Sequence, residues 1–457
     1  LTVMTFLGAG MLSGISAQVS PLQVDTLKET KIPDQWDLQS CIDYAKEQNI
    51  TIRKNRITAA STQIDVKTAK AALFPSLSFS TGHQVVNRPY QETSSRVSGS
   101  EIISSNSKTS YNGNYGLNAS WTLYNGNKRL KTIQQEKLNN QMAELDVATS
   151  ENNIQESIAQ VYIQILYAAE SVKVNENTLQ VSIAQRDRGQ ELLNAGSIAK
   201  SDLAQLEAQV STDRYQLVTA QATLEDYKLQ LKQLLELDGE NEMNIYLPAL
   251  SDENVLAPLP TKRDVYISAL SLRPEIEASK LNVEASELGI NIAKSSYFPT
   301  ISLSAGIGTN HTSGSDFTFG EQVKNGWNNS IGLSVSVPIF NNRQTKSAVQ
   351  KAKLQYETSM LSLLDEQKAL YKTIESLWLD ANSAQQRYAA ANEKLKSTQI
   401  SYELISEQFN LGMKNTVELL TEKNNLLQAQ QEQLQAKYMA ILNTQLLKFY
   451  QGDQLAI

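Results

Sequence analysis

Two segments of this 457-residue chain alternate between apolar and small polar side chains: residues 111–125 read YNGNYGLNASWTLYN, and residues 328–341 read NNSIGLSVSVPIFN. Alternation with a period of two is typical of β-strands whose two faces meet different surroundings. The pattern fits a transmembrane β-barrel, with apolar side chains toward lipid, and it also fits a soluble sandwich. It recurs twice more along the chain. We therefore expect four strands, at about 76–87, 110–124, 300–310 and 328–340.

Aromatic residues mark the ends of the expected strands that adjoin helical segments. Such side chains prefer the boundary between membrane and water, where a ring is half solvated. Ordinary core packing is the alternative for any one of them, but their recurrence in both halves of the chain favours the membrane boundary. The expected membrane-interface residues are Phe74, Trp121, Tyr124, Tyr297, Phe298 and Phe340.

Four strands cannot close a barrel within one chain. A sheet exposed to lipid cannot leave its edge amides unpaired, because no water is present to satisfy them. The smallest known transmembrane barrels have about eight strands, so a barrel here must be shared between chains. Two chains would give about eight strands and a filled lumen, and three would give about twelve and room for a channel. Strand spacing does not decide between three chains and four.

The chain also has the composition of long helices. Residues 91–247 and 339–457 contain no proline, and proline is the strongest helix breaker. Helical periodicity runs from about 127 to 193 and from about 342 to 409. Each stretch has roughly 67 residues and would be about 100 Å long.

Each long helix is expected to reverse at a glycine. Gly196 and Gly412 follow the two helical stretches and suit a left-handed helix cap. Shorter helices are expected to return at about 199–236 and 415–449. Apolar and small residues at three-four spacing predict coiled-coil seams on these helices. The seam positions on the second long helix are Leu370, Ile374, Leu377, Ala381, Ala384, Tyr388, Ala391, Leu395, Thr398, Tyr402 and Ile405, and those on the first returning helix include Leu203, Leu206, Val210, Leu217, Ala220 and Leu224.

The second half of the chain resembles the first half. Gly116 corresponds to Gly332, and Gly196 corresponds to Gly412 at the same spacing. Residues 1–17 are uncharged, and about 20 apolar residues are needed to span a membrane, so this segment resembles a signal peptide with a truncated start. A buried N-terminal strand is the alternative. The expected division is a signal peptide at 1–17, a first helix-strand-strand-helix repeat at 18–245, a linker at 246–261 and a second repeat at 262–457.

The composition excludes several classes of function. The net charge of −7 weighs against nucleic-acid binding, which usually requires a basic excess. Cys41, His83 and His311 are the only cysteine and histidines, which excludes a disulfide scaffold and a Cys/His zinc site within one chain. No catalytic motif is present in the sequence. We therefore expect no enzyme, no cofactor and no metal site, and we interpret both histidines as surface residues.

The sequence resembles the TolC-like outer membrane efflux proteins. The resemblance rests on Phe-Pro before a strand at 74–75 and 298–299, on aromatic-Asn after a strand at 124–125 and 340–341, and on the segment 409–420. It implies a mixed α and β membrane protein with two structural repeats. In that fold, a long coiled-coil α-helical barrel continues into a transmembrane β-barrel to which each chain gives four strands.

The resemblance also implies a function and partners. The chain would form a homotrimer in the outer membrane of a Gram-negative bacterium, in contact with its lipid, with the helices in the periplasm. It would be a passive exit duct for drugs or other small molecules, docked to a periplasmic adaptor protein and through it to an inner-membrane pump. The exit duct of a type I protein secretion system is the alternative within this fold. A secreted coiled-coil structural or adaptor-like protein is the alternative from another class.

The family also suggests where the functional residues lie. A gate lined by acids is expected near the helix ends, with Glu403, Glu407, Asp187 and Glu191 as the candidates. Exposure to solvent is the alternative for all four, with Asp187 and Glu191 paired to nearby arginines. The expected adaptor-contacting residues at the two turns are Gly196, Ser197, Asp202, Gly412, Met413 and Glu418. The lipidated cysteine of many members is missing, and Gln408 occupies the position of an arginine that is frequent in the family.

Overall fold

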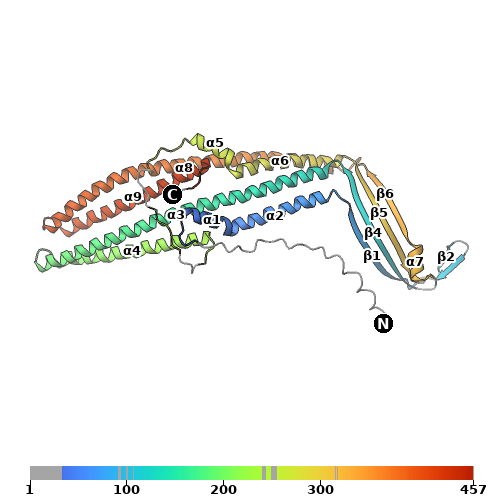
Figure 1. Ribbon diagram of the computed structural model, residues 1–457, viewed down its shortest axis with the longest axis horizontal. Coiled ribbons are helices and arrows are strands. Elements are labelled where there is room, and N and C mark those ends of the chain that lie inside the picture. The colour runs from blue at the N-terminus through green and yellow to red at the C-terminus, as the bar shows by residue number, and fades with distance from the viewer. Residues whose placement is uncertain are drawn as a thin grey trace.

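The computed structural model describes residues 33–90, 94–98, 101–105, 108–238, 243–248, 255–313, 315 and 317–455. The predicted signal peptide at 1–17 lies outside these residues. Figure 1 shows a long, narrow chain with a β-sheet at one end and the tips of two helical hairpins at the other.

The main sheet is antiparallel throughout and has the strand order β1-β4-β5-β6. Its strands are β1 (Ser76–Asn87), β4 (Thr109–Asn125), β5 (Thr300–Thr312) and β6 (Asn328–Ser336). Between β1 and β4 in the sequence, β2 (Ser94–Ser98) pairs with β3 (Glu101–Ser105). The short helix α7 (Phe319–Asn325) follows β5.

Two strand ends differ from the sequence-based expectation by more than one residue. β6 ends at Ser336, which pairs with the first residue of β5, rather than at 340. Beyond it, Pro338 has no N–H to donate and cannot extend the ladder. β5 continues to Thr312 rather than 310, because His311 and Thr312 pair with Gly113 and Asn112 of β4.

The long helices have the expected length. α3 (Lys128–Asn194) and α8 (Gln344–Asn410) have 67 residues each, and they reverse into α4 (Lys200–Leu234) and α9 (Thr416–Gln451). The buried residues of α8 confirm its predicted seam: Leu370, Ile374, Ala381, Ala384, Tyr388 and Ala391. In the described part of the chain, no helix has the length and apolar character that a membrane crossing requires.

Each half of the chain begins with a pair of shorter helices. The pairs are α1 (Leu38–Gln48) with α2 (Ile50–Ala71), and α5 (Lys262–Leu272) with α6 (Pro274–Lys294). The first pair breaks at Asn49, whose side chain accepts hydrogen bonds from the backbone N–H groups of Thr51 and Ile52, as asparagine does at helix starts. The second pair breaks before Pro274, because a residue that precedes proline is disfavoured in helical geometry.

The apolar core lies where the two hairpins meet the shorter helices. Trp36, Ile158 and Tyr162 are buried in one cluster, and Ile276 and Ile374 are buried in another. A buried cation also joins the halves: the Arg273 guanidinium contacts Glu156 of α3 at 2.9 Å and Glu275 of α6 at 2.8 Å. It also lies 4.1 Å from the centre of the Tyr450 ring of α9. These contacts hold α3, α6 and α9 together at mid-length.

Candidate functional site

The sheet has one apolar face and one polar face. Cross-strand register places Leu77 and Phe79 of β1 on the same face as Leu117 of β4 and Ile307 of β5. This face is exposed in the single chain, with Leu77 at 69% and Ile331 of β6 at 83%. Exposed apolar area of this extent indicates contact with lipid or protein. The opposite face carries uncharged residues of small size, among them Ser76, Ser78, Ser80, Asn118, Ser120, Ser302, Ser304, Gly306, Ser330, Gly332 and Ser334.

The two edges of the sheet are open in the single chain. β1 and β6 are the end strands of the sheet, and no further described strand pairs with either edge. Unpaired edge amides beside an apolar face cannot be left to lipid. In a membrane, these edges would therefore need strands from other chains.

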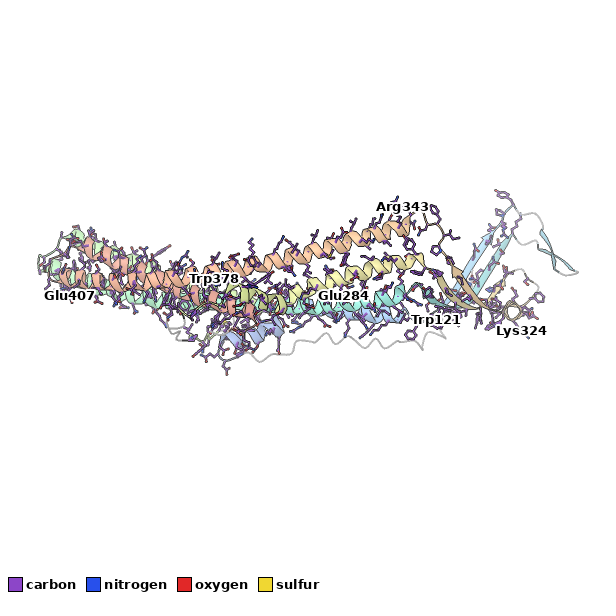
Figure 2. All side chains as sticks on the ribbon, turned by 90° about the horizontal axis from the view of Figure 1, so that it is seen from above. Trp121, Glu284, Lys324, Arg343, Trp378 and Glu407 are labelled. Atoms are coloured by element: carbon purple, nitrogen blue, oxygen red, sulfur yellow. The ribbon has the colours of Figure 1, made fainter. Side chains whose placement is uncertain are left out.

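The predicted interface aromatics gather where the sheet joins the helices. Phe74 precedes β1, Tyr297 and Phe298 precede β5, and Phe340 follows β6, and all four are exposed. Trp121 on β4 lies at this junction (Figure 2), where its indole Nε1 donates to the Leu73 carbonyl oxygen at 2.8 Å. Tyr124 is half-buried near the end of the same strand. A ring with one polar contact and one exposed face suits a membrane boundary.

The two hairpin tips have the same backbone geometry. Gly196 and Gly412 both have φ of +73°, and a Cβ at either position would meet no atom within 4 Å. The Met413 amide donates to the Gln408 carbonyl oxygen at 2.8 Å, and the Ser197 amide makes the equivalent 2.8 Å bond to Leu192. This is the hydrogen-bond pattern of a glycine helix cap. Both turns leave their side chains open to a partner, and Met413 is 71% exposed.

Asp202 and Glu418 cap the returning helices. The Asp202 carboxylate accepts the Ala199 N–H at 3.0 Å, and the Glu418 carboxylate accepts the Asn415 N–H at 3.2 Å. Hydrogen bonds from Lys414 and from that backbone N–H lower the pKa of Glu418. Both acids thus have a structural role at a helix start, and they remain near the tip surface.

The four gate candidates do not converge within one chain. Glu403 and Glu407 of α8 are exposed, and the Glu403 carboxylate accepts a hydrogen bond from Gln399 at 3.2 Å. Glu407 lies at the tip end of the molecule, far from the sheet (Figure 2). On α3, Asp187 pairs with Arg186 and Glu191 pairs with Arg188, both at the surface. A shared acidic ring would therefore require other chains.

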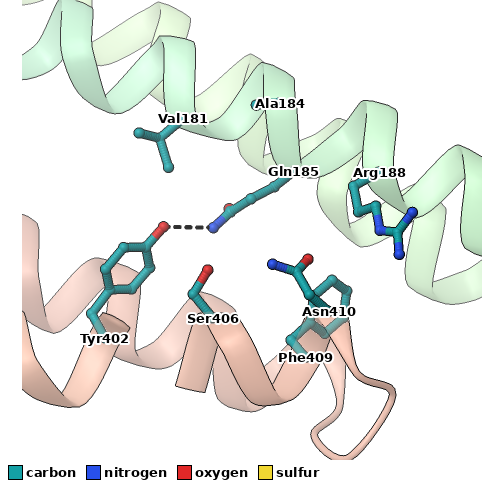
Figure 3. Close-up of a pocket in the computed structure, with 8 residues that line it drawn as sticks. All are labelled: Val181, Ala184, Gln185, Arg188, Tyr402, Ser406, Phe409 and Asn410. Atoms are coloured by element: carbon teal, nitrogen blue, oxygen red, sulfur yellow. Dashed lines mark hydrogen bonds between the residues drawn. The ribbon is translucent and has the colours of Figure 1, made fainter. Parts of the chain in front are cut away.

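A hollow between α3 and α8 was not expected from the sequence. Figure 3 shows side chains from both long helices facing each other there. The Gln185 side-chain amide donates to the Tyr402 hydroxyl at 2.8 Å and joins the two hairpins. None of the four gate candidates lines this hollow. Its lining residues are Val181, Ala184, Gln185, Arg188, Tyr402, Ser406, Phe409 and Asn410.

A buried ion pair joins the two hairpins close to their tips. Lys423 of α9 contacts Asp213 of α4, with side-chain exposures of 3% and 1%, and Ser182 of α3 contacts both. Burial lowers the pKa of the Lys423 ammonium, and the contact with Asp213 opposes that shift. The sequence did carry a signal for this cluster. Asp213 occupies the seam position between Val210 and Leu217, where an apolar residue is the rule.

Comparisons with known proteins agree with this geometry. The family model described as Outer membrane efflux protein matches residues 41–236 and 265–452. The outer membrane efflux protein BepC of Brucella suis is 24% identical over 64% of this chain and 61% of its own length. The outer membrane protein TolC of Escherichia coli K12 is 24% identical over 62% of this chain. That match spans 58% of TolC, so each of these two matches covers less than two thirds of the relative.

The fold is also found among solved structures. The outer membrane protein VceC of Vibrio cholerae superposes with a TM-score of 0.74 at 16% identity, over 92% of this chain and 97% of VceC. At this identity the likeness shows the fold alone.

Replacing Asp213 by leucine is expected to destabilise the protein by about 3–5 kcal/mol, because Lys423 is left as a buried charge without its partner. A lone buried ammonium has a lowered pKa in the folded state, so the unfolded state binds more protons. The loss of stability should therefore shrink as the pH is raised toward the ordinary lysine pKa of about 10.4. Thermal unfolding in detergent, followed by circular dichroism at several pH values, measures both effects.

Two control variants separate this effect from a general loss of charge. Replacing both Asp213 and Lys423 by leucine should cost much less than the single change, because no unpaired charge remains. Lys394→Leu breaks a half-exposed pair with Glu432 and should cost less than about 1 kcal/mol. An Asp213→Leu protein as stable as its parent would contradict the interpretation that Asp213 compensates the buried charge of Lys423.

Proposed function

Because the chain belongs to the outer membrane efflux protein family, we propose that it is the outer-membrane channel of a tripartite efflux system. In this proposal the chain is a passive duct from the periplasm of a Gram-negative bacterium to the exterior. It carries drugs or other small molecules, and an inner-membrane pump supplies the energy through a periplasmic adaptor protein. The proposal includes no enzymatic chemistry.

One observation carries the proposal most strongly. A four-stranded sheet with an exposed apolar face and two open edges lies at the end of helices that have 67 residues each. Such a sheet requires lipid on its apolar face and further strands at both edges. A secreted coiled-coil rod would explain the helices and would leave this face without a role.

We propose that three chains complete the barrel. Three copies would supply about twelve strands and leave a water-filled lumen, whereas two would supply about eight and a lumen filled with side chains. Small uncharged residues on the polar face support a lumen open to solutes. In each chain, the halves 18–245 and 262–457 would be the two structural repeats. The recurrence of paired shorter helices, two strands of the main sheet and a helical hairpin in each half supports this division.

The helical end would provide the gate and the docking surface. Both tips expose side chains on tight turns, which supports contact of Gly196, Ser197, Asp202, Gly412, Met413 and Glu418 with the adaptor. The exposed acids Glu403 and Glu407 lie four residues apart on α8 and share a face. Three-fold symmetry would turn them into acidic rings, which favour cations. Asp187 and Glu191, which already pair with arginines, are weaker candidates for a second set.

The first prediction of this proposal concerns assembly. Protein extracted from membranes in detergent should have a mass of about three chains by light scattering, because the open edges require strands from other chains. It should also be found in the outer-membrane fraction. A stable water-soluble monomer with an intact sheet would contradict the proposal.

The second prediction concerns the turn at Gly412. Valine there is strained by roughly 1–2 kcal/mol at positive φ, so the tip should deform and export should be lost. The trimer and its membrane insertion should persist, because the strands are far away. Drug accumulation in cells measures export, and gel mobility without heating measures the trimer.

Gly320→Val is the matched control for this change. A Cβ at Gly320 would also meet no atom within 4 Å, but its φ is not positive. Export should therefore survive in this variant. Unchanged export in the Gly412→Val protein would argue against a role for the tip.

The third prediction concerns ion selectivity. Single-channel recordings of the Glu403→Gln, Glu407→Gln variant should show weaker cation preference and weaker block by multivalent cations, because the acidic rings are removed. The control replaces two exposed acids far from the turn, Glu357 and Asp365, by amides. It removes the same charge and should keep the parent's selectivity. Equal selectivity in the parent and in the Glu403, Glu407 variant would exclude these acids from the gate.

A further inference from the structure

The fold brings the only two histidines of the chain together. His83 lies on β1 and His311 on β5, far apart in sequence. Cross-strand register pairs His83 with Gly113 of β4 on one side and His311 with the same Gly113 on the other. Residues directly opposite one another in an antiparallel sheet point to the same face. Both imidazoles therefore lie on one face, separated only by a residue without a side chain, and it is the face that carries Phe79, Leu117 and Ile307 nearer to the helices.

Gly113 leaves the space in which the two rings meet. A Cβ placed on Gly113 would lie 2.6 Å from Nδ1 of His311 and 3.2 Å from Nδ1 of His83. The two Nδ1 atoms are therefore separated by no more than the sum of these distances. The same Cβ would lie 2.2 Å from Cε1 of His311, so any larger residue would displace that ring. Glycine is thus a requirement of the pair.

The hydrogen bonds leave both Nδ1 atoms suited to accept a ligand. Nδ1 of His83 lies 2.8 Å from the Tyr111 hydroxyl, and its Nε2 lies 3.1 Å from the Thr81 hydroxyl. Both contacts are satisfied when Nε2 carries the proton and the lone pair of Nδ1 accepts from Tyr111. Nδ1 of His311 is buried and has no hydrogen-bond partner among the described residues.

Aromatic rings enclose the pair. The Tyr115 ring stacks against His311 at a centroid distance of 5.9 Å and meets the edge of His83 at 5.5 Å. Phe319 of α7 packs against His311 at 4.9 Å. These rings restrict both imidazoles to few orientations. In metal sites, the surrounding groups hold the ligating side chains in a fixed orientation.

We propose that His83 and His311 bind one divalent transition-metal ion per chain through their Nδ1 atoms. Imidazole nitrogen suits Cu²⁺ and Ni²⁺, and Cu²⁺ is the ion that such ligands bind most tightly. The ion would replace the Tyr111 hydroxyl group as the partner of Nδ1 of His83. Water would fill the remaining coordination positions of the ion. Calcium and magnesium are disfavoured, since they require several oxygen ligands.

With two protein ligands, a bound ion would keep free coordination positions and would be exchangeable rather than held in a closed structural centre. Among the residues that the structure describes, no group of three or more His, Cys, Asp and Glu side chains could hold a metal ion. Two protein nitrogens leave coordination positions free, as in sites that bind exogenous ligands. The site lies toward the end of the sheet that is distant from the helices, and it does not depend on the proposed duct.

Few other side chains of this chain could compete for the metal ion in a binding experiment. No other histidine is present, and Cys41 is the only cysteine. Burial raises the pKa of the Cys41 thiol to about 12, so it does not compete as a thiolate. Protein purified without a histidine tag, in detergent, is titrated with Cu²⁺ and followed by electron paramagnetic resonance. We expect one bound ion per chain with hyperfine splitting from two nitrogens.

Three variants locate the ion. His83→Asn and His311→Asn should each weaken binding by a factor of about ten or more, because one of two nitrogen ligands is lost. Gly113→Ala should do the same while both histidines remain, because its Cβ displaces His311. Glu321→Gln on the neighbouring helix α7 is the matched control and should bind as the parent does. Its carboxylate is already engaged by the Thr318 N–H at 2.8 Å.

Two results would overturn the proposal. One is unchanged Cu²⁺ affinity in the His83→Asn, His311→Asn double variant, which would place the ion on other groups. The other is a parent spectrum without a two-nitrogen signature. Circular dichroism and gel mobility without heating, measured on every variant, exclude misfolding as the reason for lost binding.

Discussion

Unpaired backbone amides at the edges of the sheet are the constraint on which the rest of this protein depends. β1 and β6 each present an open edge beside a face of exposed apolar side chains. Water could satisfy those amides, but it would not cover the apolar face, and lipid would cover the face but not satisfy the amides. In the proposed channel, strands from other copies, arranged as a closed ring, would meet both requirements. Assembly would then be part of folding for the strands of this chain.

The helices meet a different requirement. They pack together along one side, and their other surfaces are polar and suited to contact with water. α3 and α8 bury narrow seams with several alanines and keep polar residues elsewhere. Narrow seams hold a wall of helices together and leave both of its surfaces polar. The two halves also meet through buried charge, at Arg273 in mid-length and at Asp213 and Lys423 near the tips. Such pairs add less to stability than they cost when one partner is removed.

Charge is distributed unevenly along the proposed duct. The polar face of the main sheet, formed by β1, β4, β5 and β6, carries Ser, Thr, Asn, Gln, Gly and Val86 and no charged residue. The helical ends carry exposed acids and ion pairs, including Arg186 with Asp187 and Arg188 with Glu191. A neutral strand face exerts little electrostatic discrimination, so any charge selection would take place at the helical end. A passive duct needs no other chemistry along its length.

Periodicity determined the type and length of the elements, because alternation along a strand and three-four spacing along a helix are local properties. The four strands, both 67-residue helices and the seam of α8 could be predicted in this way. Contacts between residues of separate elements could not be predicted in this way. The pairing that extends β5 to Thr312, the meeting of His83 with His311 over Gly113, and the contact of Asp213 with Lys423 each join residues from separate elements. Sheet register and helix–helix contact decide such pairs, and a pattern within one segment carries no information about which distant segment lies beside it.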